Sequence, residues 1–167
     1  LCDYALQRHY PEIYAEGPER YTLLLQQVIA RQVKLVVEWL RVGFIHGVMN
    51  TDNTAISGET IDFGPCAMLG RYDPDTVFSS IDRYGRYAFG NQPSIARWNI
   101  ARLGEALLPL IDPDTDRAVE LVTEVVDAFP GRFDDQWASV VRTKLGLATD
   151  DPADHDLADS WLQLLRT

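Results

Sequence analysis

Apolar residues recur at helical spacing across residues 19–42, and this is the longest regular pattern in the sequence. The stripe consists of Tyr21, Leu24, Leu25, Val28, Leu35, Val36, Trp39 and Leu40, with Gln, Arg and Lys between its members. Because positions three and four apart share one face of an α-helix, the pattern predicts one long amphipathic helix. Gly43 is expected to close this helix, and core packing is the expected role of its apolar face.

The second half of the chain also has helical periodicity. It predicts helices over residues 94–111, 115–129, 134–145 and 154–165. Residues typical of helix ends separate them: Asp112-Pro113-Asp114 follows the first, Pro130-Gly131 lies between the second and third, and Gly146 caps the third.

The middle of the chain is less regular. Two short β-prone runs, 54–56 and 60–62, flank Ser57-Gly58-Glu59 and predict a small β-hairpin. Residues 65–93 are rich in Pro, Gly, Asp and Tyr and have no clear period. A long irregular stretch in a compact domain is either functional or disordered, and the density of aromatic residues favours an ordered loop. The predicted fold class is therefore mainly α with a small β-hairpin.

Composition limits the classes of function. The chain has 167 residues, of which 46% are hydrophobic, enough for one domain with a core. No window approaches a membrane span. The formal net charge of −10 argues against a nucleic-acid partner and against an anionic membrane surface, because both need basic patches. It is compatible with ATP, which arrives with Mg²⁺.

The cysteines and the N-terminus bear on cellular location. Cys2 and Cys66 are far apart in sequence and form neither a disulfide framework nor a zinc pattern, which fits a reducing cytosol. The first residues lack the order of basic, apolar and small regions of a signal peptide. A cytoplasmic protein is predicted. Because the sequence does not begin with Met, we expect it to be a piece of a longer protein, cut upstream.

Oxygen-bearing side chains gather in one segment of the first half. His46 and Asn53 keep the spacing of a kinase catalytic loop, H-R-D-x-x-x-x-N, whose Asn binds Mg²⁺. Asp62-Phe63-Gly64 is a literal D-F-G, the kinase motif whose Asp binds Mg²⁺ as well. Val48 stands where the kinase catalytic Asp is expected, and Asp52 directly precedes Asn53. Such hard oxygen ligands indicate a magnesium site for phosphate chemistry.

Each of these residues also has a simpler interpretation. The predicted hairpin would hold Asn53 at one end and Asp62 at the other, so that their oxygens could meet at one ion. Asn and Asp are common in turns, however, because their side chains bond nearby backbone. Asp52 could accept the proton of an attacking hydroxyl, or it could be a cap that supports Asn53.

An ordered set of motifs resembles the selenoprotein O family of kinase-like protein adenylyltransferases. The matching stretches are Arg8-His9-Tyr10-Pro11, Val42 to Asn53, Thr60 to Pro65, Gly85-Arg86-Tyr87, Asn91-Gln92-Pro93, Trp98-Asn99 and Lys144 to Leu147. They occur in family order over nearly the whole chain. The family's usual D-Y-G is D-F-G here, a change that keeps the Asp and the Gly.

The resemblance implies a fold and a domain organisation. Residues 1–167 would form a partial kinase-like domain, the C-terminal lobe of a protein-kinase-like (α+β) fold. The N-terminal lobe that clamps the nucleotide is absent, because the chain has no G-x-G-x-x-G loop and no recognisable strand-borne Lys with a Glu partner. The isolated fragment is therefore expected to be inactive.

The resemblance also implies an activity. The full-length enzyme would transfer AMP from ATP to Ser, Thr or Tyr hydroxyls of other proteins, with Mg²⁺ or alternatively Mn²⁺. Asn53 and Asp62 would be metal ligands, Asp62 would also contact the nucleotide, and Asp52 would be the proton acceptor. His46 would be structural and tie the loop to the D-F-G region.

Two other functions remain open from the residues alone. A metal-bearing Asn–Asp pair fits the transfer of a γ-phosphoryl group by a kinase-like phosphotransferase equally well. A non-catalytic, truncated binding module is the other alternative. The missing nucleotide-clamping features favour it, and the intact Asp52, Asn53 and Asp62 argue against it.

Overall fold

The computed structural model describes residues 1–148, 151 and 153–166. Six α-helices account for most of these residues: α1 (Cys2–His9), α2 (Glu19–Val42), α3 (Gln92–Ile111), α4 (Thr115–Asp127), α5 (Phe129–Leu145) and α6 (Asp154–Arg166). The other regular elements in the described part are two short strands, β1 (Phe44–Ile45) and β2 (Ala67–Met68), and two 3₁₀ turns, Thr51–Asn53 and Phe89–Asn91. The predicted fold class, mainly α with a small β-hairpin, is confirmed as a class, although the strands form at other residues than predicted.

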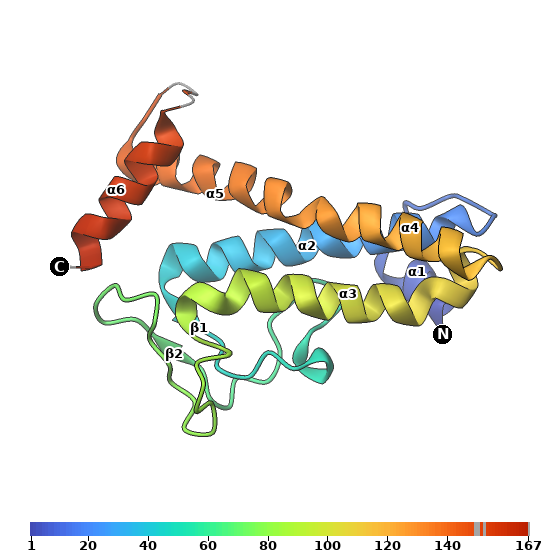
Figure 1. The fold of residues 1–167 in the computed structure, drawn as a ribbon, viewed down its shortest axis with the longest axis horizontal. Coiled ribbons are helices and arrows are strands. Elements are labelled where there is room, and N and C mark those ends of the chain that lie inside the picture. The colour runs from blue at the N-terminus through green and yellow to red at the C-terminus, as the bar shows by residue number, and fades with distance from the viewer. Residues whose placement is uncertain (149–150, 152, 167) are drawn as a thin grey trace.

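Helix α2 is the centre of the fold. It packs against α3 on one side and against α4 and α5 on another, and α6 folds back from the end of α5 (Figure 1). The side chains of Leu25, Ile29, Val33 and Val36 are fully buried along its length. Burying each such aliphatic side chain contributes about 1.5–3 kcal/mol. The prediction that the apolar stripe of residues 19–42 is core is therefore confirmed.

The C-terminal end of α2 delivers the chain to the candidate site. Gly43 adopts a left-handed conformation with φ of 78°, and its N–H bonds back to the carbonyls of Leu40 and Trp39. Lys144 of α5 donates from Nζ to the carbonyl oxygen of Arg41 at 2.5 Å. Glycine is favoured at this helix-ending position because it has no Cβ to strain, so the predicted stop at Gly43 is confirmed.

The predicted break between residues 129 and 134 is wrong. Helix α4 ends at Asp127, and α5 already begins at Phe129, so Pro130 and Gly131 lie inside its first turn. Proline is tolerated there because the first N–H groups of a helix have no intrahelical acceptor. The side chain of Phe129 is buried and anchors the start of α5 in the core.

The β element forms at a different place from the predicted hairpin. β1 and β2 pair antiparallel, with Phe44 opposite Met68 and Ile45 opposite Ala67. The runs 54–56 and 60–62 form no strand, and only the turn between them is present. The prediction of a hairpin at residues 54–62 is therefore corrected.

Side chains of the helices explain this correction. Gln32 of α2 donates from Nε2 to the carbonyl oxygen of Ala55 at 2.6 Å, and the Tyr10 hydroxyl donates to the carbonyl oxygen of Ile56. Trp39 donates from Nε1 to the hydroxyl of Thr60 at 2.9 Å. The bonds to Ala55 and Ile56 occupy carbonyls that a hairpin ladder would have used, and the bond to Thr60 holds the second run through its side chain.

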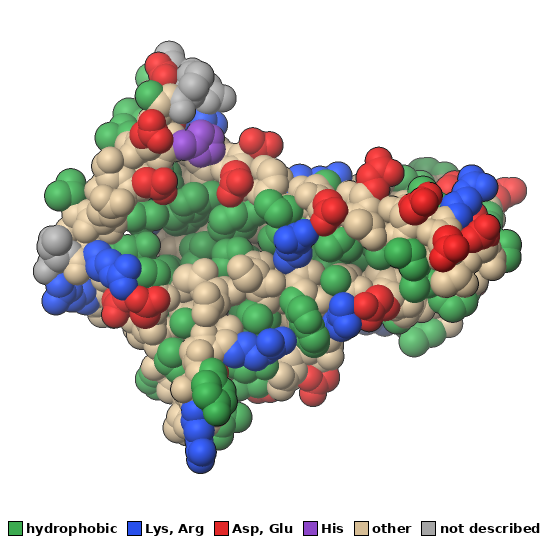
Figure 2. All heavy atoms as spheres, viewed as in Figure 1, with side chains coloured by type: hydrophobic (Ala, Val, Ile, Leu, Met, Phe, Trp, Pro, Cys, Tyr) green, Lys and Arg blue, Asp and Glu red, His purple; other side chains and the backbone are tan. Residues whose placement is uncertain are grey.

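Charged and apolar side chains share the surface seen in Figure 2. Acidic and basic groups are scattered along the outer helices, and a hollow with hydrophobic walls lies beneath α5 and α6. Among the described residues, no helix combines the length and the apolar composition needed to cross a membrane.

Candidate functional site

All three predicted site residues lie in the loop that joins β1 to β2. The strand pair closes this loop at its base, and the Leu69 N–H donates to the Gly43 carbonyl at 2.8 Å just outside the pair. Loops held by a rigid scaffold are common sites of binding and catalysis. The loop from 46 to 66 is therefore the candidate site, and we call it the catalytic loop.

His46 joins the two halves of the catalytic loop. Its side chain is buried, with 1% exposed, and Nε2 lies 2.8 Å from the carbonyl oxygen of Ile61. On the other side of the ring, the N–H of Val48 points to Nδ1 at 3.4 Å. A carbonyl can only accept a hydrogen bond, so Nε2 carries the proton and Nδ1 is the acceptor.

These contacts form a short path between the two predicted metal ligands. Asn53 donates from Nδ2 to the carbonyl oxygen of Val48 at 3.2 Å, and Val48 in turn contacts His46. His46 then binds Ile61, the residue directly before Asp62. The predicted structural role of His46, tying the loop to the D-F-G region, is confirmed.

Gly47 lets the two backbone segments approach each other closely. Its φ is 84°, and a Cβ built on it would lie 2.3 Å from the carbonyl oxygen of Pro65. No side chain fits at that distance from a backbone oxygen. Glycine is therefore required by both the conformation and the contact that bring the start of the catalytic loop against Asp62-Phe63-Gly64-Pro65.

Asp62 has a strained backbone. Its φ is 55°, and it is the one non-glycine residue with a positive φ in the described part of the chain. Asp tolerates this left-handed region better than most residues, but the conformation still costs roughly 1–3 kcal/mol, and such strain is concentrated at functional sites. Its exposed carboxylate accepts only a long bond, 3.4 Å, from the Gly64 N–H among the described residues.

Asp52 and Asn53 share the short 3₁₀ turn Thr51–Asn53. The turn is closed by the Asn53 N–H, which donates to the Asn50 carbonyl at 3.0 Å. Because Asn53 uses Nδ2 to bind Val48, its carboxamide oxygen remains for a ligand. The side chain of Asp52 is exposed and makes no hydrogen bond or ion pair within the described residues. The alternative that Asp52 caps this turn therefore has no hydrogen bond to support it.

The donor set suits a hard cation bound together with a substrate. The carboxamide oxygen of Asn53 and the carboxylate of Asp62 are oxygen ligands of the kind that Mg²⁺ prefers. Within residues 1–148, 151 and 153–166, no cluster of three or more His, Cys, Asp or Glu side chains is arranged to hold a metal. Mg²⁺ is often held by one or two protein oxygens, with phosphate oxygens and water completing its shell. These residues fit that pattern, and their convergence on one ion stays a prediction.

Polar residues outside the catalytic loop hold it in place. Gln92, fully buried at the start of α3, accepts from the His46 N–H at 2.9 Å and donates to the Phe44 carbonyl at 3.0 Å. Asn99 donates from Nδ2 to the Met49 carbonyl at 3.1 Å and to the Thr54 hydroxyl at 2.8 Å. Gln92 thus fixes the start of the catalytic loop from α3.

Tyr10 supports the loop from the N-terminal side. Its ring is fully buried, the Arg31 guanidinium lies 4.0 Å above it, and Arg31 also donates to the His9 carbonyl at 2.6 Å. Burial raises the pKa of the Tyr10 hydroxyl to about 12, so this hydroxyl stays protonated and donates to Ile56.

Two of the supporting residues were missed from the sequence. Gln32 and Trp39 lie on the buried face of α2, which was interpreted only as core. Gln32 could have been identified from the sequence, because it is a polar residue on an otherwise apolar helix face. A buried glutamine must find hydrogen-bond partners, so its position indicates contact with a backbone that lacks partners of its own.

Substitution of His46 tests its bridging role. We expect His46→Ala in the whole protein to lower the free energy of unfolding by about 1–3 kcal/mol, because the Ile61 carbonyl loses its buried partner. Chemical denaturation measures this change. His155→Ala on the exposed side of α6 is the control and should change stability by less than about 0.5 kcal/mol. Equal stability of the two variants would show that His46 does not hold the loop.

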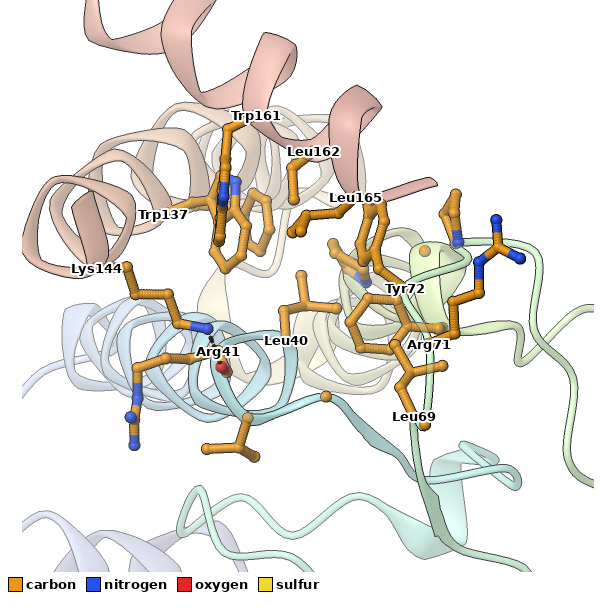
Figure 3. A pocket seen from close by; sticks show the side chains of 18 residues that line it. Leu40, Arg41, Leu69, Arg71, Tyr72, Trp137, Lys144, Trp161, Leu162 and Leu165 are labelled. Atoms are coloured by element: carbon orange, nitrogen blue, oxygen red, sulfur yellow. Dashed lines mark hydrogen bonds between the residues drawn. The ribbon is translucent and has the colours of Figure 1, made fainter. Parts of the chain in front are cut away.

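A cavity of about 480 Å³ lies away from the catalytic loop (Figure 3). Leu40, Leu69, Tyr72, Trp137, Trp161, Leu162 and Leu165 are among the residues that line it. Lys144 extends along its edge toward the carbonyl of Arg41. None of Asp52, Asn53 and Asp62 lines this cavity, so it is separate from the candidate chemistry.

Comparison with known proteins agrees with the motifs of the catalytic loop. The model of the family described as protein adenylyltransferase SelO matches residues 1–167. A relative from Pseudoalteromonas translucida, named protein nucleotidyltransferase YdiU, is 60% identical over 166 residues, which cover 99% of this chain and 35% of the relative.

Two further relatives carry the same name. One from Rhizobium rhizogenes is 58% identical over 166 residues, with 99% of this chain and 33% of the relative covered. One from Teredinibacter turnerae is 55% identical over 167 residues, with 99% of this chain and 34% of the relative covered. This chain thus spans about a third of the length of these relatives. Since the family match extends over the whole chain, the chain belongs to the SelO protein adenylyltransferase family.

Proposed function

We propose that this chain carries the proton acceptor and the metal ligands of a protein adenylyltransferase. The whole protein would transfer AMP from ATP to Ser, Thr or Tyr hydroxyls of other proteins in the cytoplasm. The observation that carries the proposal is the catalytic loop itself, in which His46 links the turn bearing Asp52 and Asn53 to the strained Asp62. The relatives' name, protein nucleotidyltransferase, supports transfer of a nucleotidyl group.

The proposed step is a displacement at phosphorus. The oxygen of the acceptor hydroxyl attacks the α-phosphorus of ATP and forms a new O–P bond. The bond between the α-phosphorus and the bridging oxygen breaks, and that oxygen leaves with its electron pair as part of pyrophosphate. The hydroxyl proton passes to the carboxylate of Asp52, which is exposed and has no competing partner among the described residues.

Asn53 and Asp62 would hold the metal ion in this scheme. Bound Mg²⁺, or Mn²⁺ in its place, would neutralise the charge that spreads over the phosphate oxygens. The exposed Asp62 carboxylate would serve both the ion and the nucleotide. The positive φ of Asp62 would turn its carboxylate toward the ion, while the preceding Ile61 carbonyl stays bound to His46.

The fold supports placement of this chain in a kinase-like enzyme. The start of the catalytic loop lies against its D-F-G segment on a helical scaffold, as the C-terminal lobe of a kinase would require. The sequence contains no G-x-G-x-x-G loop, so the nucleotide clamp would come from elsewhere in the whole protein.

Radiolabelled ATP tests the proposed reaction. With the whole protein and a protein acceptor, label on the α-phosphate should appear on the acceptor, and pyrophosphate should be released in equal amount. Label on the γ-phosphate should stay in solution, because it leaves with pyrophosphate. The Asp62→Asn variant is the control for transfer by a contaminant. Transfer of γ-label in place of α-label would contradict the proposal and identify a phosphotransferase.

A further inference from the structure

The segment from Pro74 to Asn91 forms an ordered loop beside the catalytic loop, and we call it the projecting loop. Its ends are joined by two backbone hydrogen bonds, from Phe89 N–H to the Thr76 carbonyl at 3.0 Å and from Gly90 N–H to the Pro74 carbonyl at 2.8 Å. Asn91 donates from Nδ2 to the Gly85 carbonyl at 2.7 Å. The aromatic-rich stretch is therefore ordered, as its sequence indicated.

Hydrophobic side chains are exposed on this ordered loop. Tyr84 is 98% exposed and Ile81 is 76% exposed, and Phe78 is also exposed. The loop projects from the underside of the molecule in Figure 1, and hydrophobic and basic side chains lie together on that projection in Figure 2. Because internal hydrogen bonds fix the loop, this exposure does not come from disorder. Exposed apolar groups on an ordered loop are suited to a contact made outside this chain.

The charge of the projecting loop differs from that of the whole chain. The chain carries a net charge of −10, yet Arg83 and Arg86 lie close together here. Asp82 binds the N–H groups of Arg86 and Tyr87 with its two carboxylate oxygens, at 2.8 Å and 2.7 Å, so it orders the backbone. Arg83 is exposed and forms no ion pair within the described residues. The carboxylate of Asp82 is thus engaged by the backbone, and the two arginines are available to pair with carboxylates of a partner.

A hydrogen bond connects the projecting loop to the residues of the reaction. The Tyr87 hydroxyl donates to Oδ1 of Asn50 at 2.5 Å. The carbonyl of Asn50 accepts from the Asn53 N–H at 3.0 Å and from the Thr54 hydroxyl at 3.1 Å. Asn50 thus belongs to the turn that carries Asp52, and whatever binds the projecting loop is held at a fixed position relative to that carboxylate.

A groove runs between the two loops. It has a volume of about 640 Å³, and both the catalytic loop and the projecting loop contribute to its walls. Its lining includes Asn50 from the catalytic loop and Ile81, Asp82, Arg83, Tyr84 and Arg86 from the projecting loop. The groove combines a basic side, an apolar side and a wall from the catalytic loop. A nucleotide phosphate would need only the first of these, whereas a peptide would use all three.

We propose that this groove docks the acceptor protein, through a segment with Asp or Glu beside the hydroxyl that receives AMP. This inference rests on the proposed function, since it places the acceptor next to Asp52. Arg83 and Arg86 pair with the acidic residues, and Ile81 and Tyr84 cover an apolar residue. Arg86 is held in place over the ring of Trp98, at 4.7 Å, so it is positioned before the acceptor arrives.

Peptide binding to the whole protein tests the docking site. The probes are two fluorescein-labelled peptides with one central Tyr, flanked by Glu in the first and by Gln in the second. Fluorescence anisotropy without ATP measures binding. Arg83→Glu is the test variant. Arg117→Glu on α4 makes the same change in charge and is the control, because α4 lies away from the projecting loop (Figure 1) and the ion pair of Arg117 among the described residues is with Asp112.

We expect the Glu peptide to bind more tightly than the Gln peptide and to lose affinity as salt is raised. Arg83→Glu should weaken binding of the Glu peptide by roughly tenfold and leave binding of the Gln peptide unchanged. Arg117→Glu should bind both peptides as the unmodified protein does. In turnover assays the KM for that peptide should rise, and the KM for ATP should not. Equal binding of the two peptides, an equal loss in Arg117→Glu, or a raised KM for ATP alone would overturn the inference.

The binding assay separates this inference from the proposed function. Anisotropy does not depend on which phosphate is transferred. If the Glu peptide binds as expected and receives γ-label, the docking site is supported and AMP transfer is wrong. If α-label is transferred without any preference for the Glu peptide, AMP transfer is supported and the docking site is wrong.

Discussion

Replacing Asp62 with Asn in the whole protein should reduce transfer of AMP by at least roughly 10³-fold, because a bound metal contributes several kcal/mol to stabilisation of the transition state. Asn is the sharper choice of substitution. It tolerates the φ of 55° that Asp62 adopts, and its carboxamide oxygen can still accept from the Gly64 N–H. The variant therefore removes the charge and leaves the backbone in place.

Asp62→Ala gives a second measurement at the same position. Alanine adopts the left-handed conformation less readily than Asp or Asn, so this variant loses the carboxylate and also strains the loop. Glu59→Ala is the control, since Glu59 is an exposed acidic residue of the same loop. Its carboxylate accepts a hydrogen bond from the Ser57 hydroxyl. Transfer is measured with α-labelled ATP. If only the Ala variant lost activity, the strained backbone rather than the carboxylate would be the essential feature of Asp62.

The helical part of this fold could be predicted from local pattern. The apolar stripe of residues 19–42 repeats at helical spacing over 24 residues. The helix ends at Gly43 because glycine readily adopts a positive φ. Helix α5 shows the limit of such reasoning. Pro130 looks like a break, but it occupies the first turn of a helix that begins at Phe129, whose side chain is buried in the core.

The β element could not be predicted, because its pairing is not local. β1 and β2 have two residues each, too few to show any alternation, and they meet only when the catalytic loop closes. The runs 54–56 and 60–62 have suitable residues for strands. Carbonyls of the first run bind Gln32 of α2 and Tyr10, and the Ile61 carbonyl of the second run binds His46, so the tertiary environment overrides the local preference.

The candidate site was accessible to sequence reasoning where chemistry and spacing coincide. Asp52, Asn53 and Asp62 are predicted as site residues because their residue types suit phosphate chemistry and their order matches a family. The residues that position them were harder to identify. Gln32 and Trp39 act from a helix whose periodicity indicates only packing, and their hydrogen bonds to the loop depend on a three-dimensional contact that no local pattern contains.

Replacing Asp52 with Ala should lower turnover by roughly 10²–10⁴-fold, the usual contribution of a general base. It should leave the protein as stable as before, within about 0.5 kcal/mol, because the exposed carboxylate has no partner to lose among the described residues. Binding of Mg-ATP, measured by calorimetry, should also be unchanged. Asp52→Asn keeps the shape of the side chain and removes only its ability to take a proton, so it should show the same loss.

The stability measurement decides between the two roles of Asp52. As a proton acceptor, it would affect turnover and not folding, the opposite of what we expect for His46→Ala, which removes a buried hydrogen bond. As a cap, it would affect folding, and turnover per folded molecule would stay close to normal. A less stable Asp52→Ala variant with unchanged turnover would therefore exclude the base. The acceptor's proton would then have to leave to water, with Asn53 and Asp62 supplying the chemistry of the loop through the metal.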